Sequence, residues 1–113
     1  MIRKIVDRYG KEAQLDITIE ECAELIHDIS IYKRSITKHG YSTYIVAKVA
    51  HAQLVEGVAQ AMNAINSLVY ALGIAKNELD KEIKESDCKS FMKAFGRLPK
   101  KEELDDSHFR KGN

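Results

Sequence analysis

The stretch Glu12–Arg34, with the sequence EAQLDITIEECAELIHDISIYKR, decides the fold class of this chain. Its apolar residues recur at steps of four, three, four and three, which is the spacing of one face of an α-helix. The residues of this stripe are Leu15, Ile19, Cys22, Ile26 and Ile29. We therefore expect a long amphipathic helix whose apolar stripe faces a helical core.

On either side of this stretch, the sequence predicts helices separated by breaks at glycines. The first nine residues suit a short helix that Gly10 would end. Residues 35–42 break the helical period and are expected to form a loop. A second long helix is predicted over 44–72, with Gly73 as its C-terminal stop.

The predicted helix over 44–72 begins after Ser42 or Thr43, either of which can cap its N-terminus. It contains seven alanines, and such small side chains allow a neighbouring helix to approach closely. We expect its packed face to consist of Ile45, Val49, Ala52, Val55, Val58, Met62, Ile65 and Val69.

A third helix is predicted from about Asn77 to the residue before Gly96. The pattern therefore predicts an all-α protein built as an antiparallel bundle of long helices. The helical domain would span residues 1–96, and residues 97–113 would form a charged C-terminal tail. Within this tail, the residues after Pro99 would form either a short helix or a solvated segment without regular structure.

Composition narrows the class of protein. The chain has 113 residues and one proline, and its 18 basic and 17 acidic residues leave a net charge of +1. That balance argues against binding to a nucleic-acid polymer, which usually requires a basic surplus. No stretch approaches the roughly 18 apolar residues of a membrane span, and two cysteines are too few for a disulfide scaffold. We expect a cytoplasmic protein that makes no contact with membranes.

Acidic residues gather on the first long helix. At 100° per residue, Glu20, Glu21, Glu24 and Asp28 fall within an arc of about 100°. One interpretation is a solvated acidic face. The other is a site for a hard cation, because carboxylates one helical turn apart supply the oxygen ligands that Mg²⁺ or Mn²⁺ prefers.

The segments Tyr9–Asp16, Ile19–Leu25 and Tyr32–Arg34 together resemble the MazG-like nucleoside triphosphate pyrophosphohydrolases, over roughly residues 2–83. The resemblance implies an all-α fold, assembly as a homodimer or homotetramer, and Mg²⁺-dependent hydrolysis of a nucleoside triphosphate to the monophosphate and pyrophosphate. The E-E-x-x-E segment of that family is intact here as Glu20–Glu24, and the resemblance implies Glu21 and Glu24 as metal ligands.

The second acidic segment of the family, E-x-x-D, is not intact. Where members usually read E-E-I-A-D-V, this chain reads EGVAQA over residues 56–61, so that Gly57 and Gln60 replace the two ligand acids and Glu56 remains. Because Gly57 has no side chain and an amide oxygen is a weaker Mg²⁺ ligand than a carboxylate, weak activity is expected.

The resemblance and the residue chemistry together suggest further site residues. Glu20 or Glu56 would orient the attacking water. The residues expected to contact the nucleotide are Lys33, Arg34, Gln14, Asn63 and Gln60. For several of them a structural role is the alternative: the basic pair suits a helix C-terminus, and Gln14 and Asn63 suit interhelical hydrogen bonds. His27 follows Glu24 by almost one turn and would extend the ligand set.

Two functions remain open at this level. The first is a pyrophosphohydrolase acting on nucleoside triphosphates, and the second is a catalytically inactive nucleotide-binding or structural module of the same fold. In the second, the chain would oligomerise through its alanine-rich helix. The substitutions at Gly57 and Gln60 are the sequence features that separate the two.

Overall fold

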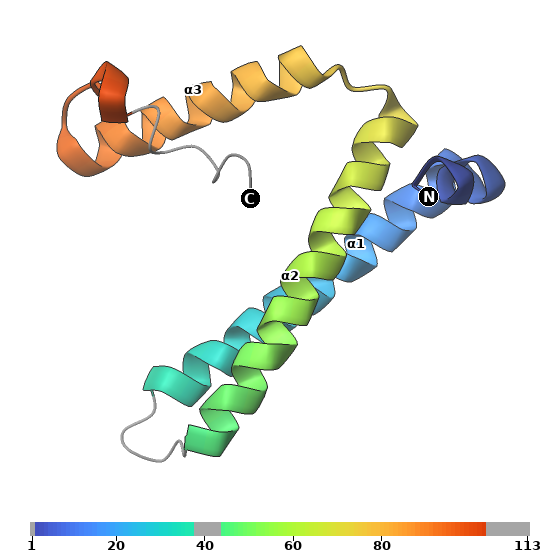
Figure 1. Cartoon of the computed structure of the whole chain (residues 1–113), viewed down its shortest axis with the longest axis horizontal. Helices are drawn as coiled ribbons and strands as arrows, with labels where there is room; N and C mark the ends of the chain where they lie inside the picture. Colours follow the sequence, from blue (N-terminus) through green and yellow to red (C-terminus); the bar gives the residue numbers. More distant parts are fainter. Residues whose placement is uncertain (1, 38–43, 104–113) are drawn as a thin grey trace. The chain divides into compact units, whose positions relative to one another are not determined.

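The structure, a computed structural model, describes residues 2–37 and 44–103, and the described part contains helices and no strands. The prediction of an all-α protein is confirmed. Three helices follow one another, as Figure 1 shows: α1 (Ile2–Thr37), α2 (Tyr44–Leu72) and α3 (Lys76–Phe95). The chain divides into two compact units, Met1–Gly73 and Ile74–Asn113, and each is described by itself.

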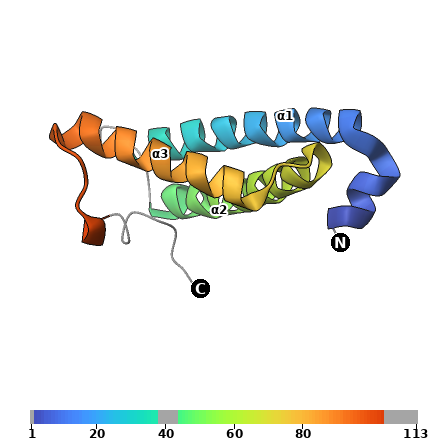
Figure 2. The same ribbon diagram turned by 90° about the horizontal axis from the view of Figure 1, so that it is seen from above.

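The first unit is an antiparallel hairpin of α1 and α2. The two helices lie side by side along most of their length (Figures 1 and 2). Contacts between residues far apart in sequence establish the direction: Gln14 meets Ala64, and Tyr32 lies 6.0 Å from His51 between ring centroids. The observed bounds of α2 agree with the predicted helix over 44–72, whereas its predicted caps, Ser42 and Thr43, lie outside the described residues.

Helix α1 bends at Gly10, which has φ 85° and ψ 173°. This left-handed conformation suits glycine because it has no Cβ. The bend directs residues 2–9 back against the C-terminal end of α2. There the Tyr70 hydroxyl donates to Asp7 Oδ1 at 3.2 Å, and the Arg3 guanidinium lies 5.5 Å from the Tyr70 ring centre. The predicted break at Gly10 is therefore confirmed as a kink between two consecutive helical segments of α1.

Small and polar residues fill the contact between α1 and α2. Both helices contribute residues at alternating steps of four and three, and all of them are buried or half-buried. On α1 this contact stripe is Gln14, Thr18, Glu21, Leu25, Asp28, Tyr32 and Ser35. On α2 it is Ala50, Leu54, Gly57, Ala61, Ala64, Leu68 and Ala71. The alanines and the glycine allow the two backbones to come close together.

Hydrogen bonds connect two buried polar side chains of this contact, Gln14 and Thr18, to each other and to α2. The Gln14 amide nitrogen donates at 3.1 Å both to the Thr18 hydroxyl and to the carbonyl oxygen of Ala64 on α2. The Thr18 hydroxyl in turn lies 2.7 Å from the Gln14 carbonyl oxygen. Since an unsatisfied buried polar group costs about 1–3 kcal/mol, this network is what permits a glutamine at the centre of a helix contact.

The residues that the sequence predicts to pack are, on both long helices, mostly not the ones that form the contact between α1 and α2, so this prediction is wrong for the hairpin. Leu15, Ile19, Ile26 and Ile29 are exposed, because the contact stripe of α1 lies one residue earlier in the sequence. On α2 the exposed residues among those predicted to pack are Ile45, Val49, Ala52, Val55, Val58, Met62 and Ile65. The small residues of α2 approach α1 through its polar stripe, and the larger aliphatic side chains are left outside that contact.

The second unit contains α3 and the residues that follow it. Helix α3 ends at Gly96, which adopts the left-handed conformation (φ 69°) and donates its backbone N–H to Met92 at 2.8 Å, as predicted for this stop. The Arg97 guanidinium then binds both carboxylate oxygens of Glu103 at 3.0 Å and lies 4.9 Å from the centre of the Phe91 ring. Residues 101–103 form a short helical turn.

None of the helices in the described part of the chain combines the length and the apolar character needed to cross a lipid bilayer.

The Arg97–Glu103 pair predicts a local dependence on pH. The two hydrogen bonds from Arg97, followed by one from the Lys100 backbone N–H, lower the pKa of Glu103 to about 2. The contact therefore contributes fully above the ordinary glutamate pKa of 4.5 and is lost as the pH falls from there toward 2. A side-chain NMR titration of Glu103 should find this low pKa, and Arg97→Gln should raise it. Lys101→Gln is the control that should leave it unchanged, and an ordinary pKa in the wild type would contradict the contact.

Candidate functional site

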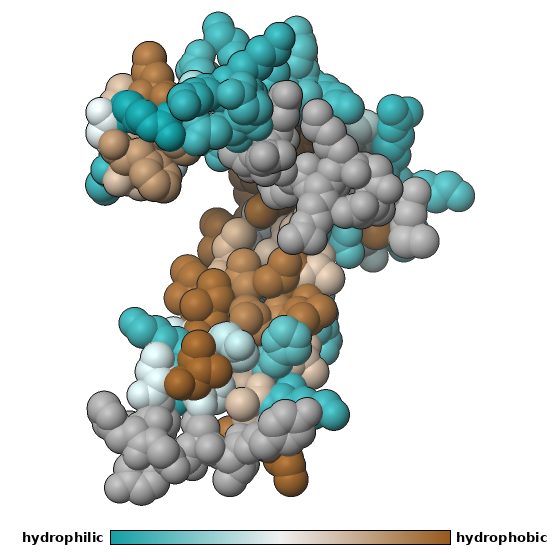
Figure 3. Space-filling view, turned by 60° about the vertical axis from the view of Figure 1, so that its left-hand side comes forward, coloured by the Kyte–Doolittle hydropathy of each residue, from teal (hydrophilic) through white to brown (hydrophobic). Residues whose placement is uncertain are grey.

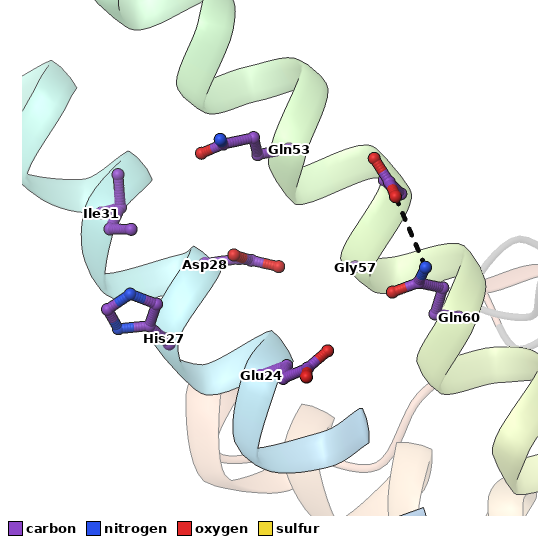
Figure 4. Close-up of a pocket in the computed structure, with 8 residues that line it drawn as sticks. Glu24, His27, Asp28, Ile31, Gln53, Gly57 and Gln60 are labelled. Atoms are coloured by element: carbon purple, nitrogen blue, oxygen red, sulfur yellow. Dashed lines mark hydrogen bonds between the residues drawn. The ribbon is translucent and has the colours of Figure 1, made fainter. Parts of the chain in front are cut away.

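An open pocket of about 310 Å³ lies between α1 and α2 on one side of the hairpin. Helix α1 lines it with Glu24, His27, Asp28 and Ile31, and α2 lines it with Gln53, Glu56, Gly57 and Gln60. Figure 4 shows Glu24 and Asp28 directed from α1 toward α2. Among the residues that line the pocket, three are carboxylates and none is lysine or arginine.

Helical spacing explains why these residues meet. Glu24, Asp28 and Ile31 are separated by four and three residues, and so are Gln60, Glu56 and Gln53 when read in the opposite direction. Residues at these spacings share one helix face. Because α1 and α2 run antiparallel, the two rows lie beside each other across the hairpin, and two stretches about 30 residues apart in sequence form a single site.

At Gly57 the Asp28 side chain from α1 lies directly against α2. A Cβ atom built on Gly57 would overlap with Oδ2 of Asp28 and would lie 3.3 Å from its Cγ atom. The Asp28 carboxylate thus occupies the space that a side chain at position 57 would need. This gives a packing reason for a glycine inside α2, where glycine costs about 0.5–1 kcal/mol relative to alanine.

On α2, the two other polar residues of the pocket are connected to each other. The Gln60 amide nitrogen donates to Glu56 Oε1 at 3.4 Å, one helical turn away (Figure 4). At this distance the bond is weak, and both side chains are exposed, so each can turn toward a ligand. The Gln60 amide oxygen is the group that stands where the resemblance predicts an aspartate.

Glu21 lies one turn before Glu24 and is half-buried in the contact stripe of α1. Its Oε2 atom is buried and has no hydrogen-bond partner among the described residues. An ionised carboxylate oxygen in such a position is costly unless a cation or a hydrogen-bond donor reaches it. The unpartnered Oε2 atom of Glu21 therefore fits a cation bound beside Glu21 and Glu24.

The structure brings some predicted site residues together and not others. Glu24, Glu56 and Gln60 line the same pocket, and His27 joins them. The residues that do not line it are Glu20, Glu21, Lys33, Arg34, Gln14 and Asn63. Of these, Gln14 makes an interhelical hydrogen bond, to the carbonyl oxygen of Ala64, which is the alternative that the sequence left open. Glu20, Lys33, Arg34 and Asn63 are exposed.

Two polar pocket residues, Asp28 and Gln53, were not predicted as site residues, and neither was the apolar Ile31. Asp28 was recognised as part of the acidic arc, and its i+4 spacing from Glu24 is the signal that would have placed it in the site. Gln53 precedes Glu56 by three residues and carried the same kind of signal. Neither could be assigned without knowing which face of α1 meets α2.

The donor chemistry of the pocket suits a hard cation only in part. Carboxylates and an amide oxygen are oxygen ligands of the kind Mg²⁺ takes. Within residues 2–37 and 44–103, however, no group of three histidine, cysteine, aspartate or glutamate side chains is close enough to hold a metal ion. The residues therefore fit a cation that keeps waters and takes further ligands from a phosphate substrate, as Mg²⁺ commonly does, and they do not form a cage made of protein alone.

No family model, curated protein or solved structure gives a significant match to this chain. The assignment of a function therefore depends on the residues of the pocket and on the motifs that the sequence carries.

The contact between Asp28 and Gly57 predicts a coupling between the two positions. Gly57→Ala should raise the free energy of unfolding by about 1 kcal/mol when Asp28 is alanine, because only helix propensity then acts. The gain should be smaller when Asp28 is present, since its carboxylate must move away from the new Cβ. Urea unfolding of the wild type, both single variants and the double variant measures this difference. Equal gains in both backgrounds would contradict the contact.

Proposed function

We propose that this chain is a Mg²⁺-dependent pyrophosphohydrolase that converts a nucleoside triphosphate to the monophosphate and pyrophosphate, using the pocket between α1 and α2. The observation that carries the proposal is the convergence of two distant segments. Glu24 of the E-E-x-x-E segment and Glu56, Gly57 and Gln60 of the degraded E-x-x-D segment line one pocket. The MazG-like helical-bundle fold is part of the same proposal.

The charge of the pocket indicates how a triphosphate would bind. With three carboxylates and no lysine or arginine lining it, the pocket repels a phosphate chain unless a divalent cation lies between them. When bound with the substrate, Mg²⁺ neutralises phosphate charge and polarises the attacking water. Glu24 and Asp28 would hold it together with waters and oxygens of the substrate, whereas Glu21, the other ligand that the resemblance implies, does not line the pocket.

The remaining pocket residues have roles that follow from their chemistry. Glu56 would accept the proton of the attacking water, whose oxygen adds to the α-phosphorus atom while the bond to the β-phosphate oxygen breaks and pyrophosphate leaves. The Gln53 and Gln60 amides and the His27 ring carry N–H groups that can donate to phosphate oxygens. Arg34 stays a candidate for a contact with the outer part of the nucleotide, whereas Lys33 comes one position after the contact stripe and lies on the side of the hairpin away from the pocket.

A low turnover follows from the two lost acids. Asp28 reaches the space beside Gly57 from the opposite helix and returns one carboxylate to that location. Nothing comparable restores the acid at position 60, where Gln60 supplies a neutral oxygen. Loss of a group that merely supports a metal ligand typically costs about 10–100-fold in activity, and loss of a ligand should cost at least as much.

A second candidate function is a nucleotide-binding or structural module without catalysis. The observation that favours it is the lack of a three-residue metal group in the described part of the chain, together with Gly57 and Gln60 at the two acid positions.

Pyrophosphate release from a panel of nucleoside triphosphates with Mg²⁺ or Mn²⁺ tests the proposal. We expect slow release by the wild type, with Glu24→Gln and Glu56→Gln each lowering the rate at least tenfold, because each removes a carboxylate from the pocket. Glu12→Gln is the matched control: the same change on the exposed surface of α1, outside the pocket, should alter the rate less than twofold.

The outcomes separate the two candidates. A wild type that binds Mg²⁺-nucleotide without releasing pyrophosphate supports the module and rules out the enzyme. A rate that Glu24→Gln and Glu56→Gln leave unchanged would mean that the reaction takes place somewhere other than this pocket.

A further inference from the structure

The end of α3 and the turn that follows it carry exposed apolar side chains. Hydrophobic side chains gather over the hairpin in the view of Figure 3, and the second unit has a smaller set of its own. Phe95 and Leu98 are 66% and 67% exposed, and Met92 is 40% exposed. Together the three present on the order of 350 Å² of apolar surface, which is within the range of about 300–600 Å² for the largest and often functional patch of a typical monomer.

The same stretch of the chain is basic throughout. Residues 88–101, which we call the basic segment, contain five lysine or arginine residues and no aspartate or glutamate, although the net charge of the whole chain is only +1. The ten residues before it, 78–87, contain five carboxylates and two lysines. The charge therefore changes sign along α3, and the positive part coincides with the exposed apolar residues.

Arg97 holds the basic segment in a defined conformation. Its guanidinium binds both carboxylate oxygens of Glu103 at 3.0 Å and lies 4.9 Å from the centre of the Phe91 ring. The Phe91 ring in turn lies 4.6 Å from the Phe95 ring between centroids. The turn after α3 is thereby connected to the last turns of the helix. Because Arg97 is engaged within the chain, the cations left for a partner are four exposed lysines: Lys89, Lys93, Lys100 and Lys101.

Lysine and apolar side chains are neighbours in the basic segment. At about 100° per residue, Lys89, Met92 and Phe95 follow one another round α3 at steps of about 60°. Lys89 therefore borders the apolar side chains, and two further lysines follow Leu98 after a single proline. Helices that lie on a membrane surface have this arrangement: apolar side chains enter the headgroup region, and long lysine side chains reach the headgroups at its boundary.

We propose that the basic segment binds the surface of an anionic lipid bilayer. Lysines contribute to such binding as point charges and need no fixed partner geometry. A protein partner fits less well, because protein interfaces favour arginine over lysine, and the arginine here is bound to Glu103. A single strand of nucleic acid would stack its bases on aromatic rings. One of the two rings lies against Arg97, however, and Met92 and Leu98 have no ring.

This inference goes beyond what the sequence suggested about membranes. No contact with a membrane was expected, because no stretch of the chain is long enough to span a bilayer. Binding at the surface requires no spanning stretch, and the small net charge of the chain is an average over acidic and basic segments. The inference depends on the second unit alone. It stands or falls independently of the proposed hydrolysis, whose pocket lies in the hairpin.

Cosedimentation of the full chain with lipid vesicles tests the proposal. The wild type should bind vesicles of equal parts phosphatidylcholine and phosphatidylserine at least tenfold more tightly than vesicles of phosphatidylcholine alone. Lys89→Gln combined with Lys93→Gln should weaken this binding at least tenfold, because two cations leave the contact. Lys76→Gln combined with Lys81→Gln is the matched control. It removes the same charge from exposed positions of the same helix outside the basic segment, and it should change the affinity less than threefold.

Two further comparisons test the apolar part of the contact. Phe95→Gln should weaken binding to the phosphatidylserine vesicles at least tenfold, whereas Ile45→Gln, at a 71% exposed position of the hairpin, should leave it unchanged. The chain has no tryptophan, so Phe95→Trp introduces a single reporter that keeps an aromatic ring. Its emission should shift to shorter wavelength with these vesicles. Tyr9→Trp, in the basic N-terminal part of α1, should show no shift.

Several outcomes would overturn the proposal. One is a wild type that does not bind the phosphatidylserine vesicles or binds both kinds of vesicle equally. Equal weakening by the two lysine pairs would also overturn it, because binding would then follow the overall charge. A shift of Tyr9→Trp without a shift of Phe95→Trp would place the contact on α1 instead. Binding of a single-stranded oligonucleotide but not of vesicles, with the same dependence on Lys89 and Lys93, would identify a nucleic acid as the partner.

Discussion

The close approach of α1 and α2 is the constraint on which the rest of the structure depends. Alanine and glycine on the contact stripe of α2 allow its backbone to come within hydrogen-bond reach of the Gln14 side chain on α1, 3.1 Å from the carbonyl oxygen of Ala64. A larger side chain at Ala61 or Ala64 would separate the helices and leave the buried amide of Gln14 without its acceptor. The cost of that unsatisfied group fixes both the spacing and the register of the hairpin.

The same approach shapes the candidate site. With the helices this close, position 57 has no room for a side chain while the Asp28 carboxylate lies against it. The carboxylate that the resemblance leads one to expect on α2 is missing, and one from α1 lies beside the same position. The acidic character of the pocket is thereby kept with a different distribution of residues over the two helices, and the neutral Gln60 remains the clearest departure from the family pattern.

Polar packing inside the hairpin has a consequence for its outer surface. Because the contact uses mainly small and hydrogen-bonding residues, most large aliphatic residues of both helices lie outside it, with Leu25, Leu54 and Leu68 as the exceptions. The hairpin therefore has two unlike sides: one carries the acidic pocket, and the other carries exposed aliphatic side chains such as Ile19, Ile26 and Val55.

The sequence alone determined the helices and most of their ends. The end of the first long helix was predicted at Arg34, with a loop over 35–42, but α1 continues to Thr37, because Ser35 still packs in the contact with α2. Helical periodicity and glycine stops act over a few residues, so the bounds 44–72, the break at Gly10 and the stop at Gly96 could be predicted from local patterns. The all-α class, the candidate residues Glu24, Glu56 and Gln60, and the departure at Gly57 also came from the sequence.

Only the tertiary structure decided which face of each helix is inside. Stripes one residue apart in α1 have the same period, and the sequence favoured the more apolar one. The polar stripe of α1 packs inside because its side chains can hydrogen-bond to the small-residue surface of α2. Ala64, which accepts the hydrogen bond from Gln14, lies 50 residues further along the chain. The same long-range contact brought Asp28 to Gly57 and so explains a glycine for which the local sequence offers no reason.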